Sequence, residues 1–319
     1  MELVLAILLL IIGLSLLIKG ADWLVEGSSA LAVKFAVSEM VIGLTIVSFG
    51  TSTPELIVNV LASQRQDADI ALGNVIGSNI VNILVILGIA GTIQHITIQK
   101  NTIWREIPFS LMAALALLIL ANDMILNGMD NVVTRGDGII LLLFFVIFLT
   151  YTFLISKVDV QDSPEIKKLS NFKMALFIFL GLILLFAGGR LVVDNAMTIA
   201  SLIGLSEQFI ALTIVAVGTS LPELFTSAVA AYKGKSDIAM GNVVGSNIFN
   251  IFFILGISAL IHPLDFKGSF NADVLMLILA SGLLFFTMFT GRKRTLDRWE
   301  AIMFIIIYMG YIIFLIYRG

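Results

Sequence analysis

Long apolar runs alternate with short polar segments along the whole chain. Ten such runs, each of about 20 residues, are centred roughly on residues 10, 50, 82, 113, 146, 184, 218, 250, 281 and 307. About 20 apolar residues in a helix cover the ~30 Å hydrocarbon core of a bilayer, whereas a membrane β-barrel shows segments of about ten alternating residues. The pattern therefore predicts an all-α membrane protein with ten transmembrane helices.

Composition agrees with this fold class. Hydrophobic residues make up 59% of the 319 residues and charged residues 13%, about half the charged share of soluble domains, and the mean hydropathy is +1.06. The absence of cysteine excludes disulfide and thiolate chemistry, and two histidines argue against a histidine-rich metal site. We expect a lipid bilayer around the chain, with no bound nucleic acid and no cofactor.

The first apolar run starts at the N-terminus, MELVLAILLL, without the positive segment of a cleaved signal peptide, so we expect it to be the first transmembrane helix. Basic residues of the connecting segments favour one side of the membrane. The segments after runs 1, 3, 5, 7 and 9 hold thirteen of them: Lys34, Lys100, Arg105, Lys157, Lys167, Lys168, Lys173, Lys233, Lys235, Arg292, Lys293, Arg294 and Arg298. The other side holds four: Arg65, Arg135, Lys267 and Arg318. The positive-inside rule places the richer side in the cytoplasm of a cell-membrane protein, with both termini outside.

The two halves of the chain repeat each other at an offset of 168 residues. DIALGNVIGSNIVNILVILGIA (69–90) aligns with DIAMGNVVGSNIFNIFFILGIS (237–258), and 16 of these 22 positions are identical. Each half holds five predicted helices, an odd number, so the second half enters the membrane from the opposite side. We therefore expect two inverted repeats, residues 1–157 and 172–319, joined by a polar cytoplasmic linker at 158–171.

One repeated motif places a carboxylate after a proline inside an apolar run: GTSTPEL (50–56) and GTSLPEL (218–224). Proline has no N–H and disturbs the helix before it, which leaves main-chain oxygens without helical partners. Thr51, Ser52 and Glu55 add side-chain oxygens close by. Oxygen donors of this kind suit hard cations such as Na⁺, Ca²⁺ and Mg²⁺.

The two glutamates of this motif carry the functional argument. A carboxylate inside a membrane costs several kcal/mol, so Glu55 and Glu223 indicate a functional site by default. Equivalent positions of inverted repeats meet near the centre of the membrane, and this brings both carboxylates to one site. For the small residues of the motif alone, helix packing remains an equally good interpretation.

A second repeated motif follows, GNVIGSNIVN (73–82) and GNVVGSNIFN (241–250). Its serine and last asparagine are four residues apart and share a helix face, which favours ligation by the pairs Ser78 with Asn82 and Ser246 with Asn250. The remaining asparagines could ligate an ion or form hydrogen bonds between helices, and the sequence leaves both open: Asn74, Asn79, Asn242 and Asn247.

GTSxPE followed by GNxxGSN, in two inverted copies, resembles the α-repeats of the cation/Ca²⁺ exchanger superfamily, and most of all its prokaryotic sodium/calcium exchanger branch. The resemblance implies a core of helices 2, 3, 7 and 8, and antiport of Na⁺ against Ca²⁺ by alternating access in a protein that works as a monomer. It implies these ion ligands: the Ser48 carbonyl, Thr51, Ser52, Glu55, Ser78 and Asn82, with the Ala216 carbonyl, Thr219, Ser220, Glu223, Ser246 and Asn250.

One departure from the family pattern bears on the coupling ion. Many exchangers of this superfamily carry an aspartate at one of the positions matching Asn82 and Asn250, and here both are neutral. A Ca²⁺/H⁺ antiporter of the same fold is therefore the alternative. A cation channel fits less well because inverted repeats suit alternating access. An intramembrane enzyme also fits less well because the clusters offer no nucleophile with a base, so we do not expect an enzyme.

Overall fold

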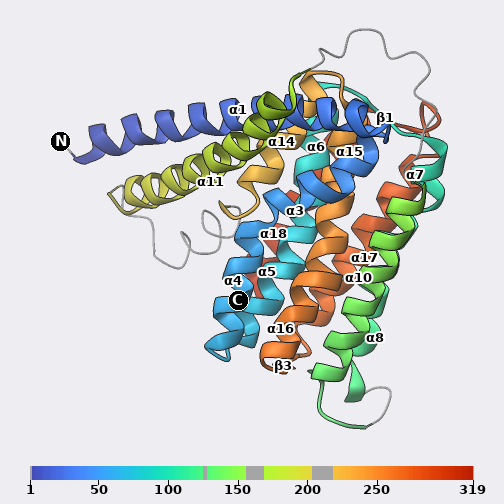
Figure 1. The fold of residues 1–319 in the computed structure, drawn as a ribbon. Coiled ribbons are helices and arrows are strands. Elements are labelled where there is room, and N and C mark those ends of the chain that lie inside the picture. Colours follow the sequence, from blue (N-terminus) through green and yellow to red (C-terminus); the bar gives the residue numbers. More distant parts are fainter. Residues whose placement is uncertain (1, 125–127, 156–168, 203–217, 319) are drawn as a thin grey trace.

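The computed structural model describes residues 2–124, 128–155, 169–202 and 218–318, and these are mostly helical (Figure 1). Within this part of the chain, eight helical stretches are long and apolar enough to cross a membrane: 2–35, 68–93, 100–120, 135–154, 171–202, 236–261, 270–287 and 298–318. A ninth candidate span, Glu39–Thr51 with Thr53–Gln64, is bent by 48° at its break. These nine stretches coincide with nine of the ten predicted apolar runs.

In the first half, the described elements are α1 (Glu2–Phe35), α2 (Glu39–Ile42), η1 (Gly43–Val47, a π-helical turn), α3 (Ser48–Thr51), α4 (Thr53–Gln64), α5 (Ala68–Val81), η2 (Asn82–Ile86, π-helical), α6 (Leu87–Ile93), β1 (Ile96–Thr97), α7 (Lys100–Trp104), α8 (Glu106–Leu120), β2 (Val132–Val133) and α10 (Arg135–Ile155). In the second half they are α11 (Asn171–Leu202), α14 (Leu221–Tyr232), α15 (Ser236–Ile248), η4 (Phe249–Leu255, π-helical), α16 (Gly256–Ile261), β3 (Leu264–Asp265), α17 (Phe270–Thr287), β4 (Thr295–Leu296) and α18 (Arg298–Arg318).

The seventh predicted helix, centred near residue 218, is described only in its second part, α14. The predicted ligand Ala216 and most of the linker predicted at 158–171 lie outside the described residues. α14 matches α4 at the offset of 168 residues, since Leu221 and Tyr232 correspond to Thr53 and Gln64.

The most buried helices occupy the middle of the bundle. For each long helix, burial was compared over its most apolar stretch of 18 residues. Buried residues make up 72% of this stretch in 68–93 and 78% in 236–261, and 17–39% in the other six helices. α8, α10, α17 and α18 pack around these two central helices, and the largest apolar core cluster joins all of them. These two helices carry the serine and asparagine side chains of the two GNxxGSN motifs, most of which are buried. Polar side chains within a membrane face the interior of the helix bundle rather than lipid, and this explains the central position of both helices.

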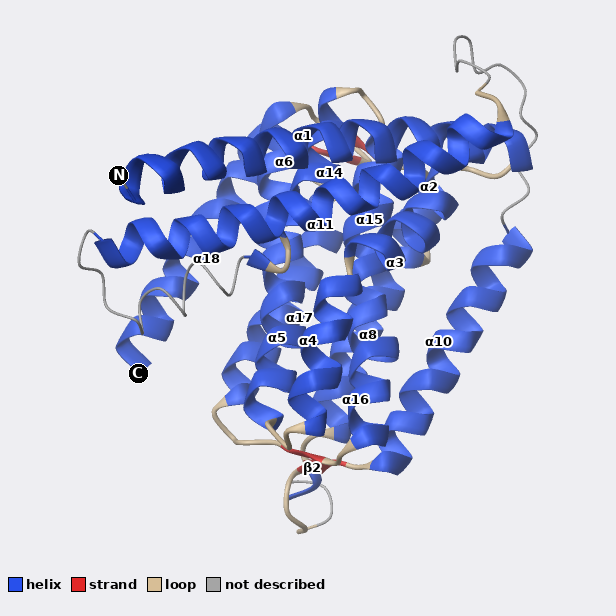
Figure 2. Cartoon of the chain, turned by 60° about the vertical axis from the view of Figure 1, so that its left-hand side comes forward, coloured by secondary structure: helices blue, strands red, loops and turns tan. Residues whose placement is uncertain are grey.

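α1 and α11 form a separate pair that crosses the ends of the other helices at a steep angle (Figures 1 and 2). α1 has 34 residues, about 51 Å at 1.5 Å per residue, so it must tilt strongly to fit a core of about 30 Å. The pair packs backbone against backbone: a Cβ atom on Gly20 would lie 2.7 Å from the Gly181 carbonyl oxygen, and one on Gly188 would lie 2.8 Å from that of Gly13.

Two short antiparallel sheets close the two ends of the bundle. β1 pairs with β4, with Ile96 opposite Leu296, and β2 pairs with β3, with Val133 opposite Leu264 (Figure 2 labels β2). β1 and β3 occupy equivalent positions of the two repeats because 96 and 264 differ by 168. Each half therefore contributes one strand to the sheet at each end.

Candidate cation site

The first proline motif interrupts its helix as predicted, and the second includes a turn directly before α14. Ser52 separates α3 from α4 with φ −81° and ψ 8°, and Pro54 lies in the first turn of α4. Ser220 has φ −85° and ψ 5° before α14, whose first turn holds Pro222. Proline fits a first helical turn because the N–H it lacks has no helical partner there.

The two asparagines favoured as ligands lie at irregular points of the central helices. Asn82 begins the π-helical turn η2, and Asn250 is the second residue of η4. A π-helical turn inserts an extra residue into an α-helix, and such turns are frequent at functional sites. Both central helices therefore change their geometry at equivalent positions, next to the broken helices.

The broken helices bring hydroxyls of each half onto the carboxylate of the other. The Ser52 hydroxyl donates to Glu223 Oε1 at 2.9 Å and lies 3.0 Å from the Ser246 hydroxyl. The Ser220 hydroxyl donates to Glu55 Oε1 at the longer distance of 3.4 Å. Each carboxylate is 1% exposed, so both are enclosed by protein. The structure thus brings the predicted glutamates and three of the predicted serines into one cluster.

Several oxygens of this cluster have no hydrogen-bond donor. Among the described residues, the buried side-chain atoms without a partner include Glu55 Oε2, Glu223 Oε2, Asn82 Oδ1, Asn250 Oδ1 and Thr219 Oγ1. Leaving a buried acceptor unpaired costs about 1–3 kcal/mol, and more when it is charged. Carboxylate, amide and hydroxyl oxygens are also the ligands that hard cations prefer. A cation bound among these atoms would satisfy oxygens that the protein leaves unpaired.

Other predicted ligands lie close by with partners of their own. The Thr51 hydroxyl donates to Asn242 Oδ1 at 3.0 Å. The Ser48 carbonyl accepts from the Ser52 N–H at 2.9 Å and lies 3.4 Å from the Thr51 hydroxyl. Ser78 is buried on α5, one turn before Asn82.

The asparagines for which the sequence left two roles open form hydrogen bonds between helices. Asn74 Nδ2 donates to the Glu55 carbonyl at 3.4 Å, and Asn242 Nδ2 donates to the Glu223 carbonyl at 3.3 Å. These bonds anchor the first turns of α4 and α14 at the carboxylates. Asn79 and Asn247 bond with each other across the repeats, as described below.

No group of three or more histidine, cysteine or acidic side chains suited to a metal ion occurs among the described residues. A cation in this cluster would therefore rely on Glu55 and Glu223 for charge and on neutral oxygens for the remaining ligands. Two carboxylates supply a charge of −2, which one divalent or two monovalent cations would neutralise.

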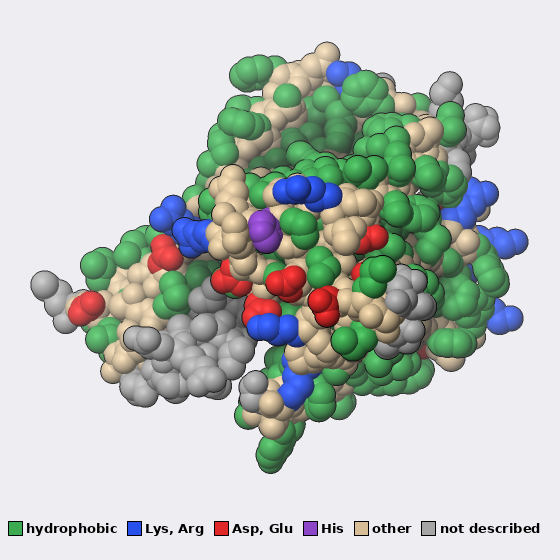
Figure 3. Space-filling model, turned by 90° about the horizontal axis from the view of Figure 1, so that it is seen from below, with side chains coloured by type: hydrophobic (Ala, Val, Ile, Leu, Met, Phe, Trp, Pro, Cys, Tyr) green, Lys and Arg blue, Asp and Glu red, His purple; other side chains and the backbone are tan. Residues whose placement is uncertain are grey.

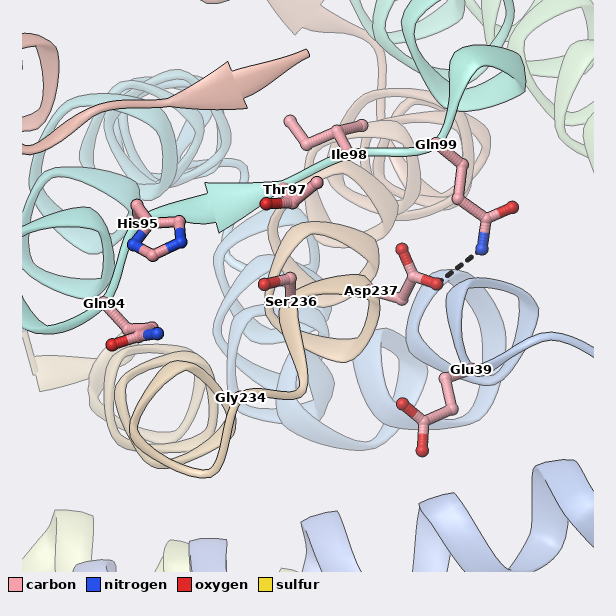
Figure 4. A pocket seen from close by; sticks show the side chains of 9 residues that line it. All are labelled: Glu39, Gln94, His95, Thr97, Ile98, Gln99, Gly234, Ser236 and Asp237. Atoms are coloured by element: carbon pink, nitrogen blue, oxygen red, sulfur yellow. Dashed lines mark hydrogen bonds between the residues drawn. The ribbon is translucent and has the colours of Figure 1, made fainter. Parts of the chain in front are cut away.

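Two pockets bear on access to the site, one at an end of the helix bundle and one beside Thr219. A polar pocket of about 450 Å³ at the β1 end contains Glu39, His95 and Asp237 (Figure 4). A largely apolar pocket of about 390 Å³ lies between α4, α11 and α14, and Thr219 and Arg190 are among its lining residues. The second pocket reaches Thr219 from the side covered by α11, and Thr219 Oγ1 is one of the buried atoms without a partner.

Sequence reasoning missed several polar links at the two ends of the bundle. Gln99 donates to Asp237 at 2.6 Å at one end, and Lys267 forms an ion pair with Asp69 at the other. Positions 99 and 267 are equivalent in the two repeats, as are 69 and 237. The same link therefore occurs at both ends of the bundle, with the two halves of the chain exchanging roles. Comparing charged positions at the 168-residue offset could have indicated these pairs.

The opposite end of the bundle, near β2 and β3, is rich in acidic side chains. Figure 3 views the molecule from this side, and acidic side chains gather there beside a few basic ones. Asp69 and Asp265 are exposed at this end, Asp137 is half-buried, and Lys267 forms an ion pair with Asp69. A negative surface of this kind would concentrate cations near it.

The fold and the buried cluster define a polytopic α-helical membrane protein in which the starts of α4 and α14 bring buried oxygens of both halves together, a layout common among secondary transporters. Residues 5–154 and 173–317 match the family model described as sodium/calcium exchanger protein. The chain belongs to this sodium/calcium exchanger family.

Two relatives match almost end to end. The putative antiporter CaxA of Alkalimonas amylolytica is 36% identical over 97% of this chain and 98% of its own length. The sodium/calcium exchanger MaX1 of Methanosarcina acetivorans is 32% identical over 97% of this chain and 98% of its own length. A solved structure of the sodium-calcium exchanger NCX_Mj, soaked with 10 mM Na⁺ and no Ca²⁺, superposes with a TM-score of 0.84 at 32% identity, covering 97% of this chain and 98% of that one.

Proposed function

We propose that the protein is a secondary antiporter that exchanges Na⁺ for Ca²⁺ across the cell membrane by alternating access to one buried site. The observation that carries the proposal is the set of buried oxygens without partners on Glu55, Glu223, Asn82 and Asn250. Proteins rarely leave such atoms unpaired unless an ion or water completes them. The names of the relatives MaX1 and NCX_Mj support Na⁺ and Ca²⁺ as the two ions.

Exchange follows from competition for the same oxygens. Glu55 and Glu223 together carry −2, which balances one Ca²⁺ or two Na⁺. Without a cation, two carboxylates in a low-dielectric interior repel each other, and this disfavours the empty site. If only loaded forms change access, each Ca²⁺ that crosses in one direction requires Na⁺ to return in the other.

The alternating-access part of the proposal rests on ten helices in two inverted repeats, 1–157 and 172–319. The reciprocal contacts at the two ends support it, because the sheet pairing of β1 with β4 recurs as β3 with β2. α4, α5, α14 and α15 hold the site, while α1 and α11 pack mainly on each other. We propose that the α1–α11 pair moves relative to this core to open the site to either side in turn.

Proteoliposomes with purified protein test this function directly. Vesicles loaded with Na⁺ are diluted into Na⁺-free buffer containing radiolabelled Ca²⁺, beside choline-loaded vesicles and vesicles with a pH gradient. We expect uptake only with internal Na⁺, and a fall of about a hundredfold or more in Glu55→Gln, because losing one of two buried charges costs several kcal/mol.

Glu106→Gln is the matched control. Glu106 is also buried at 8% exposure with an unpartnered Oε2, but it lies on α8 against Tyr151 and outside the cluster. This variant should keep its Na⁺-driven uptake. Uptake driven equally by a pH gradient without Na⁺ would contradict Na⁺ coupling and establish Ca²⁺/H⁺ antiport, the function favoured by neutral residues at 82 and 250. No uptake under any gradient would overturn the choice of Ca²⁺.

A further inference from the structure

Four buried asparagines form a closed set of hydrogen bonds between the two central helices, and we call this set the amide ring: Asn79, Asn82, Asn247 and Asn250. Asn82 Nδ2 donates to Asn247 Oδ1 at 2.9 Å, and Asn250 Nδ2 donates to Asn79 Oδ1 at 2.9 Å. Asn79 Nδ2 donates to the Asn247 carbonyl at 3.2 Å, and Asn247 Nδ2 to the Asn79 carbonyl at 3.3 Å. All four side chains are at most 1% exposed.

The main-chain carbonyls fix the orientation of every amide in the ring. A carbonyl oxygen only accepts, so Asn79 and Asn247 must turn their NH₂ groups toward these carbonyls. Their Oδ1 atoms then face Asn250 and Asn82, and each of those residues must turn its NH₂ group inward to donate. Reversing one amide would place two acceptors or two donors against each other in a buried interior.

This arrangement leaves one oxygen on each outer amide. Asn82 Oδ1 and Asn250 Oδ1 are buried without partners, as are Glu55 Oε2 and Glu223 Oε2. η2, which begins at Asn82, packs on α14 with Glu223, and η4, which holds Asn250, packs on α4 with Glu55. We propose that Asn79 and Asn247 are positioning residues, which hold the amides of Asn250 and Asn82 so that oxygen rather than nitrogen faces the cation. The inference rests on the proposed function, because it concerns the ligands of the same site.

The ring also explains why both of these ligand positions are neutral. An ionised aspartate at position 82 would bring a carboxylate oxygen against Asn247 Oδ1, and two acceptors cannot bond to each other. Asn247 cannot reverse its amide to help, because its Nδ2 is held by the Asn79 carbonyl. The same reasoning applies to position 250 and Asn79. The ring thus selects amides, and it limits the ligand charge of the site to that of Glu55 and Glu223.

The crossed pairing gives a sharp test, since Asn247 holds Asn82 of the other half and not its neighbour Asn250. The dissociation constant of Ca²⁺ is measured by calorimetry on the purified full-length protein in detergent, and Na⁺ is measured in the same way. Asn247→Leu should weaken Ca²⁺ binding about tenfold, within the range known for residues that orient metal ligands. Asn82→Ala, which removes the ligand oxygen itself, should weaken it by at least as much.

The double variant Asn82→Ala with Asn247→Leu should bind no more weakly than Asn82→Ala alone, because both changes remove the same ligand oxygen. Asn250→Ala with Asn247→Leu should show the product of the two single effects, because these changes affect different oxygens. Asn122→Leu is the matched control: Asn122 forms a reciprocal amide pair with Asn271 away from the site, and its loss should leave the dissociation constant unchanged.

The outcomes separate positioning from a structural role. A variant that only folds less well would show fewer binding sites per molecule, with an unchanged dissociation constant in the rest. That result, or effects of Asn82→Ala and Asn247→Leu that multiply, would overturn the positioning role while the proposed function stands. If the unmodified protein bound neither Ca²⁺ nor Na⁺, the proposed function would fail and the inference with it.

Discussion

At the scale of single residues, the carboxylates show how the site is balanced. Glu223 Oε1 receives a close hydrogen bond from Ser52, whereas the equivalent bond from Ser220 to Glu55 is 0.5 Å longer (3.4 Å against 2.9 Å). The second oxygen of each carboxylate has no partner. Neutral hydroxyl donors cannot compensate two buried charges, so the site should be stabilised by cations and destabilised without them.

We predict that Ca²⁺ reverses the order of thermal stability of the unmodified protein and the Glu223→Gln variant. In excess chelator the variant should melt at a higher temperature than the unmodified protein, because it removes one of two carboxylates that repel each other. With Ca²⁺ at a hundred times its dissociation constant, the unmodified protein should gain about 2.7 kcal/mol and become the more stable of the two. Melting followed by intrinsic fluorescence in detergent tests this, and a variant that is less stable in chelator would contradict the repulsion.

At the scale of elements, the α1–α11 pair depends on glycine contacts between the two backbones. Gly188 faces main-chain atoms of α1. A Cβ atom added at Gly188 would lie 2.8 Å from the Gly13 carbonyl oxygen and 2.9 Å from the Leu17 nitrogen. A real Cβ never approaches main-chain atoms so closely, so any side chain there must separate the helices. A Cβ atom added at Gly189, the next residue, would have no other atom within 4 Å.

These neighbours provide a matched pair of substitutions. Gly188→Ala should destabilise the protein by about 1–3 kcal/mol, the usual cost of overpacking, whereas Gly189→Ala should be neutral or slightly stabilising because alanine favours helix. The apparent melting midpoints of the two variants, measured side by side, test this. Equal midpoints would mean that the tight packing of α1 on α11 contributes little to stability.

At the scale of the whole molecule, the proposed orientation places the β1–β4 end in the cytoplasm and the acidic β2–β3 end outside. The chain has no cysteine, so each introduced cysteine is unique. Met129, 68% exposed, lies in the segment before β2, and Lys293 is exposed just before β4.

We predict that an impermeant maleimide labels Met129→Cys on intact cells and labels Lys293→Cys only after the membrane is opened. Full labelling of both after permeabilisation serves as the control for accessibility. The reverse pattern would contradict the positive-inside assignment. It would place the β1–β4 end outside and the β2–β3 end in the cytoplasm.

Much of the fold follows from the sequence alone. Nine of the ten apolar runs are helical stretches of the described chain, since a bilayer permits few other solutions for such segments. Pro54 predicted the break between α3 and α4, and Pro222 predicted the turn before α14, because proline disrupts a regular helix at the turn before it. The match of GTSTPEL (50–56) with GTSLPEL (218–224) indicated equivalent roles for Glu55 and Glu223.

Only the tertiary structure decided how these parts meet. Ser52 bonds to Glu223, 171 residues away, rather than to a residue of its own repeat, and Asn82 is held by Asn247 across the same interface. Local periodicity gives the face of a helix on which a residue lies, but not which atom of an amide points where. That choice depends on the carbonyl oxygens of Asn79 and Asn247, which become neighbours only when the two central helices pack together.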